Sequence, residues 1–293
     1  MDMMNIFIFG AGYSAQHFAK KQINAKSQIS NIFGTTRSVN KLDLLRQNNI
    51  QPILWDSSTS SAELHDALQK TTHLIISTAP DDNGDPVLNR KNLLDNMPHL
   101  QWVGYLSTIG VYGDHHGDWI DETAICRPPL KRNQKRLEAE KAWQTFADKR
   151  NLPLAIMRLS GIYGPKRNAF IKLQDGTARR IIKKDQVFNR IHVDDIAGVL
   201  EHFCQHKQAG LFNVSDDLPS PPQDVINYAA KLMGIAPPPE IAFEDADLSS
   251  MARTFYGDNK RIKNEKLKNT GYKFIYPDYK TALNALWQNK NWD

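Results

Sequence analysis

A glycine-containing turn near the start of the chain has the residues needed to bind phosphate. Gly10-Ala11-Gly12-Tyr13-Ser14-Ala15 follows an apolar, strand-like run and precedes a helical pattern. In such a unit Gly10 permits the tight turn, Gly12 lets a diphosphate approach the backbone, and Ala15 lets the helix pack on the strand. The helix N-terminus presents free N–H groups to the phosphates. The turn therefore predicts a dinucleotide site formed by Gly10, Gly12, Tyr13, Ser14 and Ala15.

The segment after the second predicted strand indicates which dinucleotide is bound. NAD-binding proteins place an acidic residue there to hold the ribose hydroxyls. This chain has Thr36-Arg37-Ser38 instead, with no acid. A carboxylate would repel a 2′-phosphate, whereas Arg37 can pair with it bidentately, helped by the hydroxyl of Thr36 or Ser38. We therefore predict NADP as the cofactor in preference to NAD.

Strands that alternate with helices position this turn. Apolar runs at 6–9, 31–34, 51–54, 73–77, 102–106 and 154–159 predict strands, and the segments 14–23, 42–46, 62–68 and 132–149 predict helices between them. Alternation at this spacing predicts βαβ units, hence an α/β fold with a Rossmann-like, doubly wound parallel sheet.

The pattern changes beyond Gly164-Pro165. Short predicted strands at 188–193, 211–214 and 241–243 mix with predicted helices at 194–205 and 222–233. We therefore predict an NAD(P)-binding Rossmann domain over 1–165 and a smaller, mixed, substrate-binding domain over 166–293. Residues 187–214 are expected to return to the Rossmann core.

Composition limits the function classes. The 293 residues carry a net charge of +5, and the basic runs 131–136 and 179–184 lack an aromatic stripe or zinc signature, so we expect no nucleic-acid partner. The basic excess suits an anionic small ligand. Cys126 and Cys204 match no metal-ligand spacing and are interpreted as free thiols in a reducing compartment, with no metal. The N-terminal residues resemble neither a signal peptide nor a membrane span, which predicts a cytoplasmic protein.

Several further segments, in their order and spacing, resemble an atypical subgroup of the extended short-chain dehydrogenase/reductase superfamily, also called the NAD-dependent epimerase/dehydratase family. Beside the glycine turn, these segments are Ser77–Pro80 (STAP), Tyr105–Asp114 (YLSTIGVYGD), Arg158–Pro165 (RLSGIYGP), Asn189–Asp195 (NRIHVDD) and Phe212–Asp216 (FNVSD). The resemblance covers most of the chain. It implies a nicotinamide cofactor contacted by Thr78, Ala79 and Pro80, a small polar substrate such as a sugar or nucleotide sugar, and a homodimer paired through the helix at 132–149.

The family's catalytic residues are only partly present. In that family a Ser or Thr after the fifth strand acts with a Tyr and a Lys four residues apart on the next helix; the Tyr is the general acid or base, and the Lys lowers its pKa and holds the nicotinamide ribose. Thr108 matches the hydroxyl position, and Ser107 is its neighbour. Registering Leu137–Glu140 on the family pattern places Arg132 at the tyrosine position and Arg136 at the lysine position.

Arginine cannot replace a tyrosinate as base, because it stays protonated at any working pH. Arg132 could instead bind an anionic substrate or stabilise a developing oxyanion, and Arg136 could keep the ribose-binding role. Both could equally be solvated charges on a helix face. Three residues are candidate replacement acids. They are Tyr112, beside the expected nicotinamide end, His192, whose ordinary pKa suits proton transfer, and Tyr163, which follows the sixth strand at the carboxyl edge of the sheet, where α/β sites form.

Four groups have structural interpretations. The resemblance makes Tyr112 a packing residue and His192 a structural residue. Asp194 or Asp195 is expected to cap the helix that follows, rather than to bind a metal. The pair His115-His116 is interpreted as a solvated loop.

Two functions remain open at this point. The first is an NAD(P)-binding epimerase/dehydratase-like oxidoreductase with an altered acid–base set. The alternative is a catalytically silent NADP-binding sensor or regulatory protein, which the missing Tyr/Lys pair motivates. Fold alone does not decide between them.

Overall fold

The computed structural model of the protein describes residues 3–22, 28–58 and 60–293. In the first half of the chain the elements are β1 (Met4–Phe9), α1 (Tyr13–Gln22), β2 (Ile29–Thr36), a 3-10 turn (Val39–Lys41), α2 (Leu42–Gln47), β3 (Gln51–Leu54), α3 (Ala62–Lys70), β4 (His73–Ile76), α4 (Lys91–Asp95), β5 (Trp102–Thr108), a second 3-10 turn (Ile109–Val111), β6 (Trp119–Ile120) and α5 (Lys131–Arg150). They continue with β7 (Leu154–Leu159), β8 (Gly161–Tyr163), α6 (Ala169–Gln174), β9 (Arg180–Ile182), β10 (Arg190–His192), α7 (Val193–His206), β11 (Gly210–Val214), α8 (Pro222–Met233), β12 (Glu240–Ala242), α9 (Ser250–Gly257), β13 (Arg261–Ile262), α10 (Glu265–Lys268) and α11 (Tyr279–Gln288).

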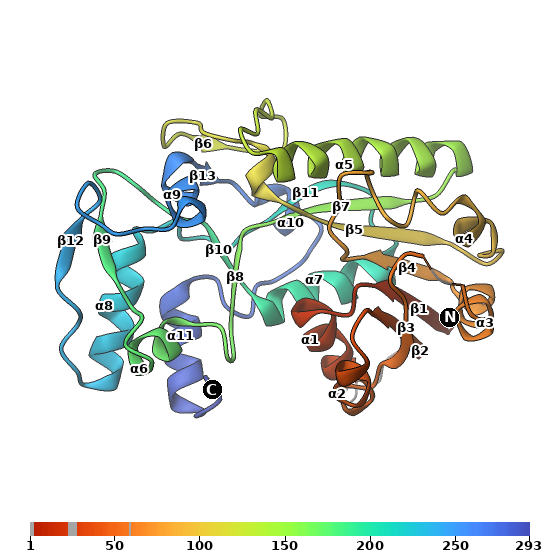
Figure 1. The fold of residues 1–293 in the computed structure, drawn as a ribbon, viewed down its shortest axis with the longest axis horizontal. Coiled ribbons are helices and arrows are strands. Elements are labelled where there is room, and N and C mark those ends of the chain that lie inside the picture. Colours follow the sequence, from red (N-terminus) through yellow and green to blue (C-terminus); the bar gives the residue numbers. More distant parts are fainter. Residues whose placement is uncertain (1–2, 23–27, 59) are drawn as a thin grey trace. The chain divides into compact units, whose positions relative to one another are not determined.

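The central sheet has seven strands in the order β3-β2-β1-β4-β5-β7-β11 (Figure 1). Strand β1 pairs in parallel with β2 and β4, β2 with β3, and β4 with β5. This is the order of a doubly wound sheet, and it changes direction between β1 and β4. The predicted Rossmann-like fold is confirmed, and the glycine turn after β1 lies at the point where ligands bind in such sheets.

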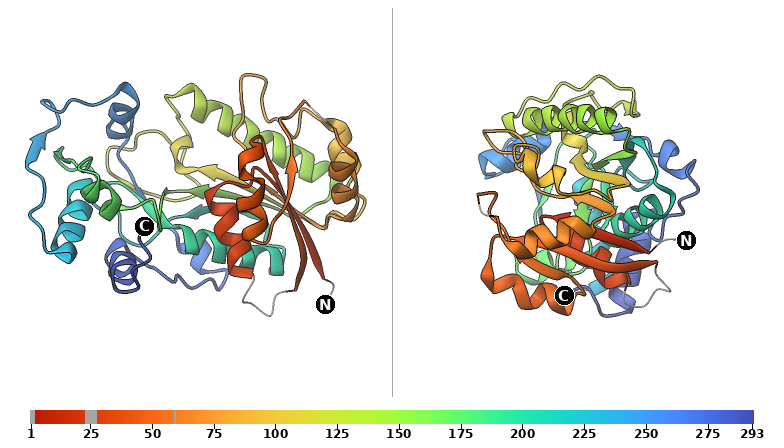
Figure 2. Two further views of the ribbon diagram at one scale, coloured as in Figure 1. Left: turned by 60° about the horizontal axis from the view of Figure 1, so that its bottom comes forward. Right: turned by 90° about the vertical axis from the view of Figure 1, so that its right-hand side faces the viewer.

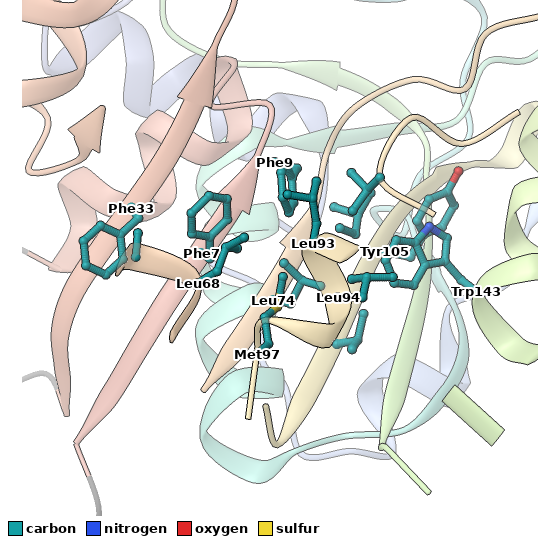
Figure 3. Close-up of a cluster of buried hydrophobic side chains, with 14 of the residues drawn as sticks. Phe7, Phe9, Phe33, Leu68, Leu74, Leu93, Leu94, Met97, Tyr105 and Trp143 are labelled. Atoms are coloured by element: carbon teal, nitrogen blue, oxygen red, sulfur yellow. The ribbon is translucent and has the colours of Figure 1, made fainter. Parts of the chain in front are cut away.

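Aromatic and aliphatic side chains fill one face of this sheet. Phe7 and Phe9 of β1 are fully buried and belong to one apolar cluster with residues of α3, α4 and α5 (Figure 3). Trp143 of α5 lies in the same cluster. The helix α7 runs along the opposite face (Figures 1 and 2). Burial on both faces explains why the strands read as continuous apolar runs rather than alternating ones.

The chain divides into two compact units. Unit 1 comprises residues 1–111, 129–158 and 196–212, and unit 2 comprises 112–128, 159–195 and 213–293. Unit 2 has its own apolar cluster between α6, α8 and α11, and short parallel strand pairs β8–β10, β9–β12 and β6–β13. The predicted domain boundary after residue 165, and the return of 187–214 to the core, stay predictions.

Two local expectations are wrong. The strand expected at 188–193 is shorter, because Arg190–His192 pair with β8 while Phe188 forms only an isolated antiparallel bridge with Ser220. Asp194 and Asp195 do not cap α7 from outside, because the helix already begins at Val193 and places both in its first turn. The Nδ1 atom of His192 accepts the N–H of Asp194 instead (3.2 Å).

The predicted helix 14–23 ends at Ile23, which lies outside the described residues. Among the described residues no helix is both long and apolar enough to span a membrane, and no group of three or more His, Cys, Asp or Glu could hold a metal ion. Neither Cys126 nor Cys204 forms a disulfide bond.

Candidate functional site

The glycine turn is held tightly against β2 and β4. Gly10 has a positive φ of 87°, and a Cβ there would approach the backbone nitrogen of Thr78 to 3.1 Å, so only glycine fits without strain. The N–H of Gly10 donates to the Thr35 hydroxyl (2.8 Å), and the N–H of Ala11 donates to the Thr35 carbonyl (2.8 Å). The sequence interpretation missed Thr35, whose role depends on strand pairing.

The second glycine faces open space. A Cβ on Gly12 would meet nothing closer than the Gly10 carbonyl at 4.0 Å. The N–H of Gln16 donates to the carbonyl of Gly12 (3.0 Å), so the helix continues directly from the turn. Ser14 and Ala15 are both buried. Because Gly12 has no side chain, the space beside it stays open at the start of α1. A diphosphate fits in this space.

The end of β2 carries the predicted adenosine-binding residues. Arg37 is exposed, and Ser38 donates its N–H to the hydroxyl of Thr36 (3.2 Å). The three residues therefore form a short polar turn at the carboxyl end of β2, next to the glycine turn that β2 supports through Thr35. No acidic residue lies between positions 34 and 42.

The ends of β4 and β5 are joined by Arg136. Its Nη1 atom donates to the carbonyls of Thr78 (3.1 Å) and Leu106 (3.1 Å) and to the hydroxyl of Tyr105 (3.2 Å). Arg136 is therefore a fixed cation at the carboxyl edge of the sheet rather than a freely solvated one. The hydroxyl oxygen of Thr78 is buried and has no hydrogen-bond partner among the described residues. Ala79 and Pro80 continue from it.

Tyr105 brings a phenol to Arg136 from an unexpected direction. It comes from β5, not from the helix, and it is fully buried. Burial raises the pKa of the Tyr105 phenol, and the Arg136 cation offsets this only in part. Tyr105 therefore stays protonated and serves to position Arg136. The sequence interpretation did not assign it a role.

Ser107 and Thr108 have different partners. The Ser107 hydroxyl donates to the carboxylate of Glu140, which is itself held by Arg158. The Thr108 hydroxyl accepts the N–H of Gly110 (3.1 Å), so its own proton is not used in that bond. Ser107 is buried, whereas Thr108 is partly exposed. Of the two, Thr108 is the residue able to donate to a bound molecule.

A buried ion pair lies beneath these hydroxyls. Nη2 of Arg158 is 2.6 Å from Oε2 of Glu140, and Nε of Arg158 is 3.1 Å from Oε1. Both side chains are almost completely buried. A bidentate arginine–carboxylate pair fixes the geometry of both groups. It links α5 to β7 and, through Ser107, to the end of β5. Sequence reasoning missed the pair because its members are far apart along the chain.

Arg132 lies one turn before Arg136 and is exposed. Helix α5 begins after Leu130 with no side-chain cap and no acidic residue in its first turn. Lys135 forms an ion pair with the exposed Asp82. The start of α5 is therefore strongly basic, which favours an anion.

Tyr163 belongs to unit 2. Its ring packs edge-on against His192, with centroids 5.2 Å apart. Its hydroxyl is buried without a hydrogen-bond partner among the described residues, and burial together with the negative charge of Asp216 raises its pKa well above the ordinary value. Tyr112, in the same unit, is fully buried and donates to Oδ1 of Asn213 (2.7 Å).

Comparison with known proteins identifies the fold. No protein-family model matches the chain, and no curated protein gives a significant match. A conserved protein of unknown function from Silicibacter pomeroyi DSS is 44% identical, with a TM-score of 0.88, over 97% of this chain and 98% of that one. A proposed NAD-dependent epimerase/dehydratase from Methylobacillus flagellatus is 24% identical, with a TM-score of 0.73, over 99% of each chain.

A third solved structure, a human epimerase family protein with NADPH, is 14% identical, with a TM-score of 0.74, over 98% of this chain and 100% of that one. The chain has the fold of the NAD-dependent epimerase/dehydratase family. It belongs to the same family as the Silicibacter protein, which has no known function. Within the epimerase/dehydratase fold, the glycine turn, Arg136 and Thr108 of this chain all lie at or near the carboxyl ends of β1, β4 and β5.

Proposed function

We propose that the protein is an NADP-binding, epimerase/dehydratase-like oxidoreductase that acts on a small polar substrate. The observation that carries this proposal is the glycine turn, where Gly10 is pressed against Thr78 and Gly12 faces open space. The similar structures support a nicotinamide cofactor, since one is described as NAD-dependent and another contains NADPH. Cytoplasmic location and a homodimer paired through α5 remain predictions.

The cofactor would be held by groups on this chain. The N–H groups at the start of α1 and the open face of Gly12 suit the diphosphate. Arg37, with Thr36 and Ser38, would bind a 2′-phosphate, which is the reason to prefer NADP. The hydroxyl of Thr78, which has no hydrogen-bond partner in the described part of the chain, would donate to the nicotinamide half. When bound, the cofactor supplies hydride transfer.

Arg136 takes the place of the family's lysine in this proposal. All of its described hydrogen bonds leave from Nη1, so Nε and Nη2 can donate to ribose hydroxyls. Thr108 donates its free proton to the substrate, while Ser107, committed to Glu140, keeps the end of β5 in place. Arg132 binds an anionic group of the substrate or stabilises negative charge on its oxygen.

The alternative is a catalytically silent NADP-binding regulator. It is favoured by the nature of Arg132 and Tyr105: the first cannot accept a proton, and the second is a fully buried phenol whose pKa is raised. Transfer of deuterium from labelled NADPH to a sugar or carbonyl compound distinguishes the two functions. Such transfer supports the enzyme and excludes the silent regulator.

The cofactor assignment is tested by titrating NADPH and NADH against wild-type protein and Gly12→Asp. The new side chain has room, so the fold should persist, but its charge should repel the diphosphate and weaken NADPH binding about a hundredfold. Gly257→Asp is the matched control, since a Cβ there also meets nothing within 4 Å and φ is not positive. Unchanged affinity in Gly12→Asp, or no binding of either nucleotide to wild type, contradicts the proposal.

A further inference from the structure

The peptide group that joins Ala11 to Gly12 lies in the middle of the glycine turn, and hydrogen bonds fix both of its polar atoms. Its carbonyl oxygen, on Ala11, accepts a hydrogen bond from Nε2 of Gln16 (3.2 Å). Its N–H, on Gly12, donates to the carbonyl of Gly10 (2.8 Å). A half-turn rotation of this peptide would break both bonds, so the two partners together select one orientation.

Strand β2 holds Ala11 on its other sides. The N–H of Ala11 donates to the carbonyl of Thr35 (2.8 Å). Its methyl group lies against Gly34, where an added Cβ would come within 2.9 Å of it, so a larger residue at position 34 would displace Ala11. Ala11 is only 5% exposed. The bond to its carbonyl oxygen is different, because it comes from the long, half-buried side chain of Gln16 on helix α1.

A second amide holds the side chain of Gln16 in place. Oε1 of Gln16 accepts a hydrogen bond from Nδ2 of Asn48 (3.2 Å), the residue that follows the last turn of α2. Asn48 is itself anchored, since its backbone N–H donates to the carbonyl of Leu44 (3.2 Å). A carbonyl oxygen only accepts, so Nε2 of Gln16 must face Ala11 and Oε1 must face Asn48. Two bonds therefore order one flexible side chain, which a single bond would do less well.

The orientation of this peptide matters because of the charge that the turn is proposed to bind. A helix N-terminus attracts a diphosphate through its N–H groups, whereas a carbonyl oxygen carries a partial negative charge and repels it. An Ala11 carbonyl without a partner would be free to turn toward the phosphates. A turn that must be ordered when its ligand arrives also binds more weakly than one that is ordered in advance. Fixing the peptide before binding removes both costs.

We infer that Gln16 is a positioning residue for the cofactor: its side-chain amide holds the Ala11 carbonyl so that the glycine turn is ordered before a diphosphate arrives, and Asn48 holds Gln16. The identity of the ligand rests on the proposed function, whereas the ordering of the turn is a property of the free protein. Gln16 lies just outside the Gly-x-Gly-x-x-Ala pattern. The spacing of the glycines therefore does not reveal its role.

Gln16→Met tests this inference, because methionine has a similar length and helix propensity but no N–H donor. Titration of the full chain with NADPH should show about tenfold weaker binding than wild type, the equivalent of one good hydrogen bond. Affinity for 2′-AMP, which carries a 2′-phosphate but no diphosphate, should stay at the wild-type value. A variant that had lost its fold would bind both ligands more weakly, so this split separates positioning from a structural defect.

Amide hydrogen exchange of the free protein gives a second readout. The N–H of Gly12 should exchange about tenfold faster in Gln16→Met, because its peptide can then rotate away from Gly10. Asn48→Ala should weaken NADPH binding less, about threefold, because Gln16 keeps its bond to Ala11 but loses its own support. The double variant should bind NADPH as Gln16→Met does, since Asn48 acts through Gln16.

Gln144→Met is the matched control, because Gln144 also donates from Nε2 to a neighbour, Oδ1 of Asp148 (2.8 Å), but lies exposed on α5. It should bind NADPH as wild type does. Wild-type protein that binds neither NADPH nor NADH contradicts the proposed function and, with it, the cofactor role of Gln16. Wild-type affinity for NADPH in Gln16→Met, an equal loss of affinity for 2′-AMP, or unchanged exchange at Gly12 each overturns this inference alone.

Discussion

Glu140 in unit 1 and Asp195 in unit 2 are both buried carboxylates, but their partners differ in charge. Glu140 is held bidentately by the guanidinium of Arg158 and accepts a hydrogen bond from Ser107. Within the described part of the chain, the carboxylate of Asp195 accepts hydrogen bonds from neutral donors, namely the hydroxyl of Tyr272 and the backbone N–H groups of Ile275 and Tyr276. Burial raises the pKa of Asp195 to about 6, and these neutral donors lower it only in part.

This difference suits two tasks. The Glu140–Arg158 pair gives a fixed charge arrangement under the residues that are proposed to meet substrate and cofactor. The carboxyl of Asp195 connects the first turn of α7 to the segment 275–276 through hydrogen bonds. A carboxylate that must keep its charge and its geometry over a range of pH needs a cation beside it, as Glu140 has in Arg158. A carboxyl group that only connects two segments, as Asp195 does, can be held by neutral donors.

The largest effect is expected from breaking the ion pair. Arg158→Met leaves Glu140 buried without a cation and should lower the free energy of unfolding by about 3–5 kcal/mol, measured by urea denaturation. The double variant Glu140→Leu/Arg158→Met removes both charges and should recover most of that loss. A single variant as stable as wild type would show that the pair is not the anchor described here.

The next effect concerns Asp195 and pH. The folded protein binds a proton on Asp195 more tightly than the unfolded chain, since the pKa rises from 3.8 to about 6. Its contribution to stability is therefore fully present below pH 3.8 and is lost as pH rises through 6. Relative to Asp195→Asn, wild type should lose about 3 kcal/mol of unfolding free energy between pH 4 and pH 7.

Urea denaturation across that pH range measures this difference. Asp224→Asn is the control, because Asp224 also lies in the first turn of a helix but is exposed. It should leave the pH dependence close to that of wild type. If the unfolding free energy of Asp195→Asn depends on pH as that of wild type does, the pKa of Asp195 is not raised, and its neutral donors stabilise the charged carboxylate as well as a cation would.

The smallest effect separates the two hydroxyls at the end of β5. Ser107→Ala removes a hydrogen bond to a charged group and should cost about 2 kcal/mol, whereas Thr108→Ala removes a bond to a neutral N–H and should cost about 1 kcal/mol. Differential scanning calorimetry of both variants shows which of the two substitutions lowers the stability more. The reverse order would mean that Ser107 is not tied to Glu140 and could itself face a ligand.

Much of the fold follows from local pattern. The apolar runs predicted the strands β1–β5 and β7, and the glycine turn marked the passage from β1 to α1. The short strands of unit 2 were harder to place, because pairs such as β8–β10 have only three residues each and no clear periodicity. The start of α7 was misplaced because two adjacent acids resemble a cap, although His192 already supplies the acceptor.

In the candidate site, too, some features could be predicted from the sequence and others could not. Its glycines and Arg37 could be named from residue type and spacing, and Arg136 from the resemblance to the epimerase/dehydratase family, but the partners of these residues could not. Thr35 and Tyr105 support the turn and the arginine through contacts made across neighbouring strands. Nothing in the residues around either position signals that role.

The sequence by itself determined the alternating α/β pattern, the glycine turn between β1 and α1 and the placement of Arg132 and Arg136 on the helix α5, because each depends on residues close together in the chain. Only the tertiary structure decided that Arg136 is fixed to β4 and β5, that Ser107 is committed to Glu140 while Thr108 is not, and that Asn48 reaches Gln16. The physical reason is that strand register and buried pairing join residues far apart in sequence. Their free energy depends on which groups meet, which local periodicity does not specify.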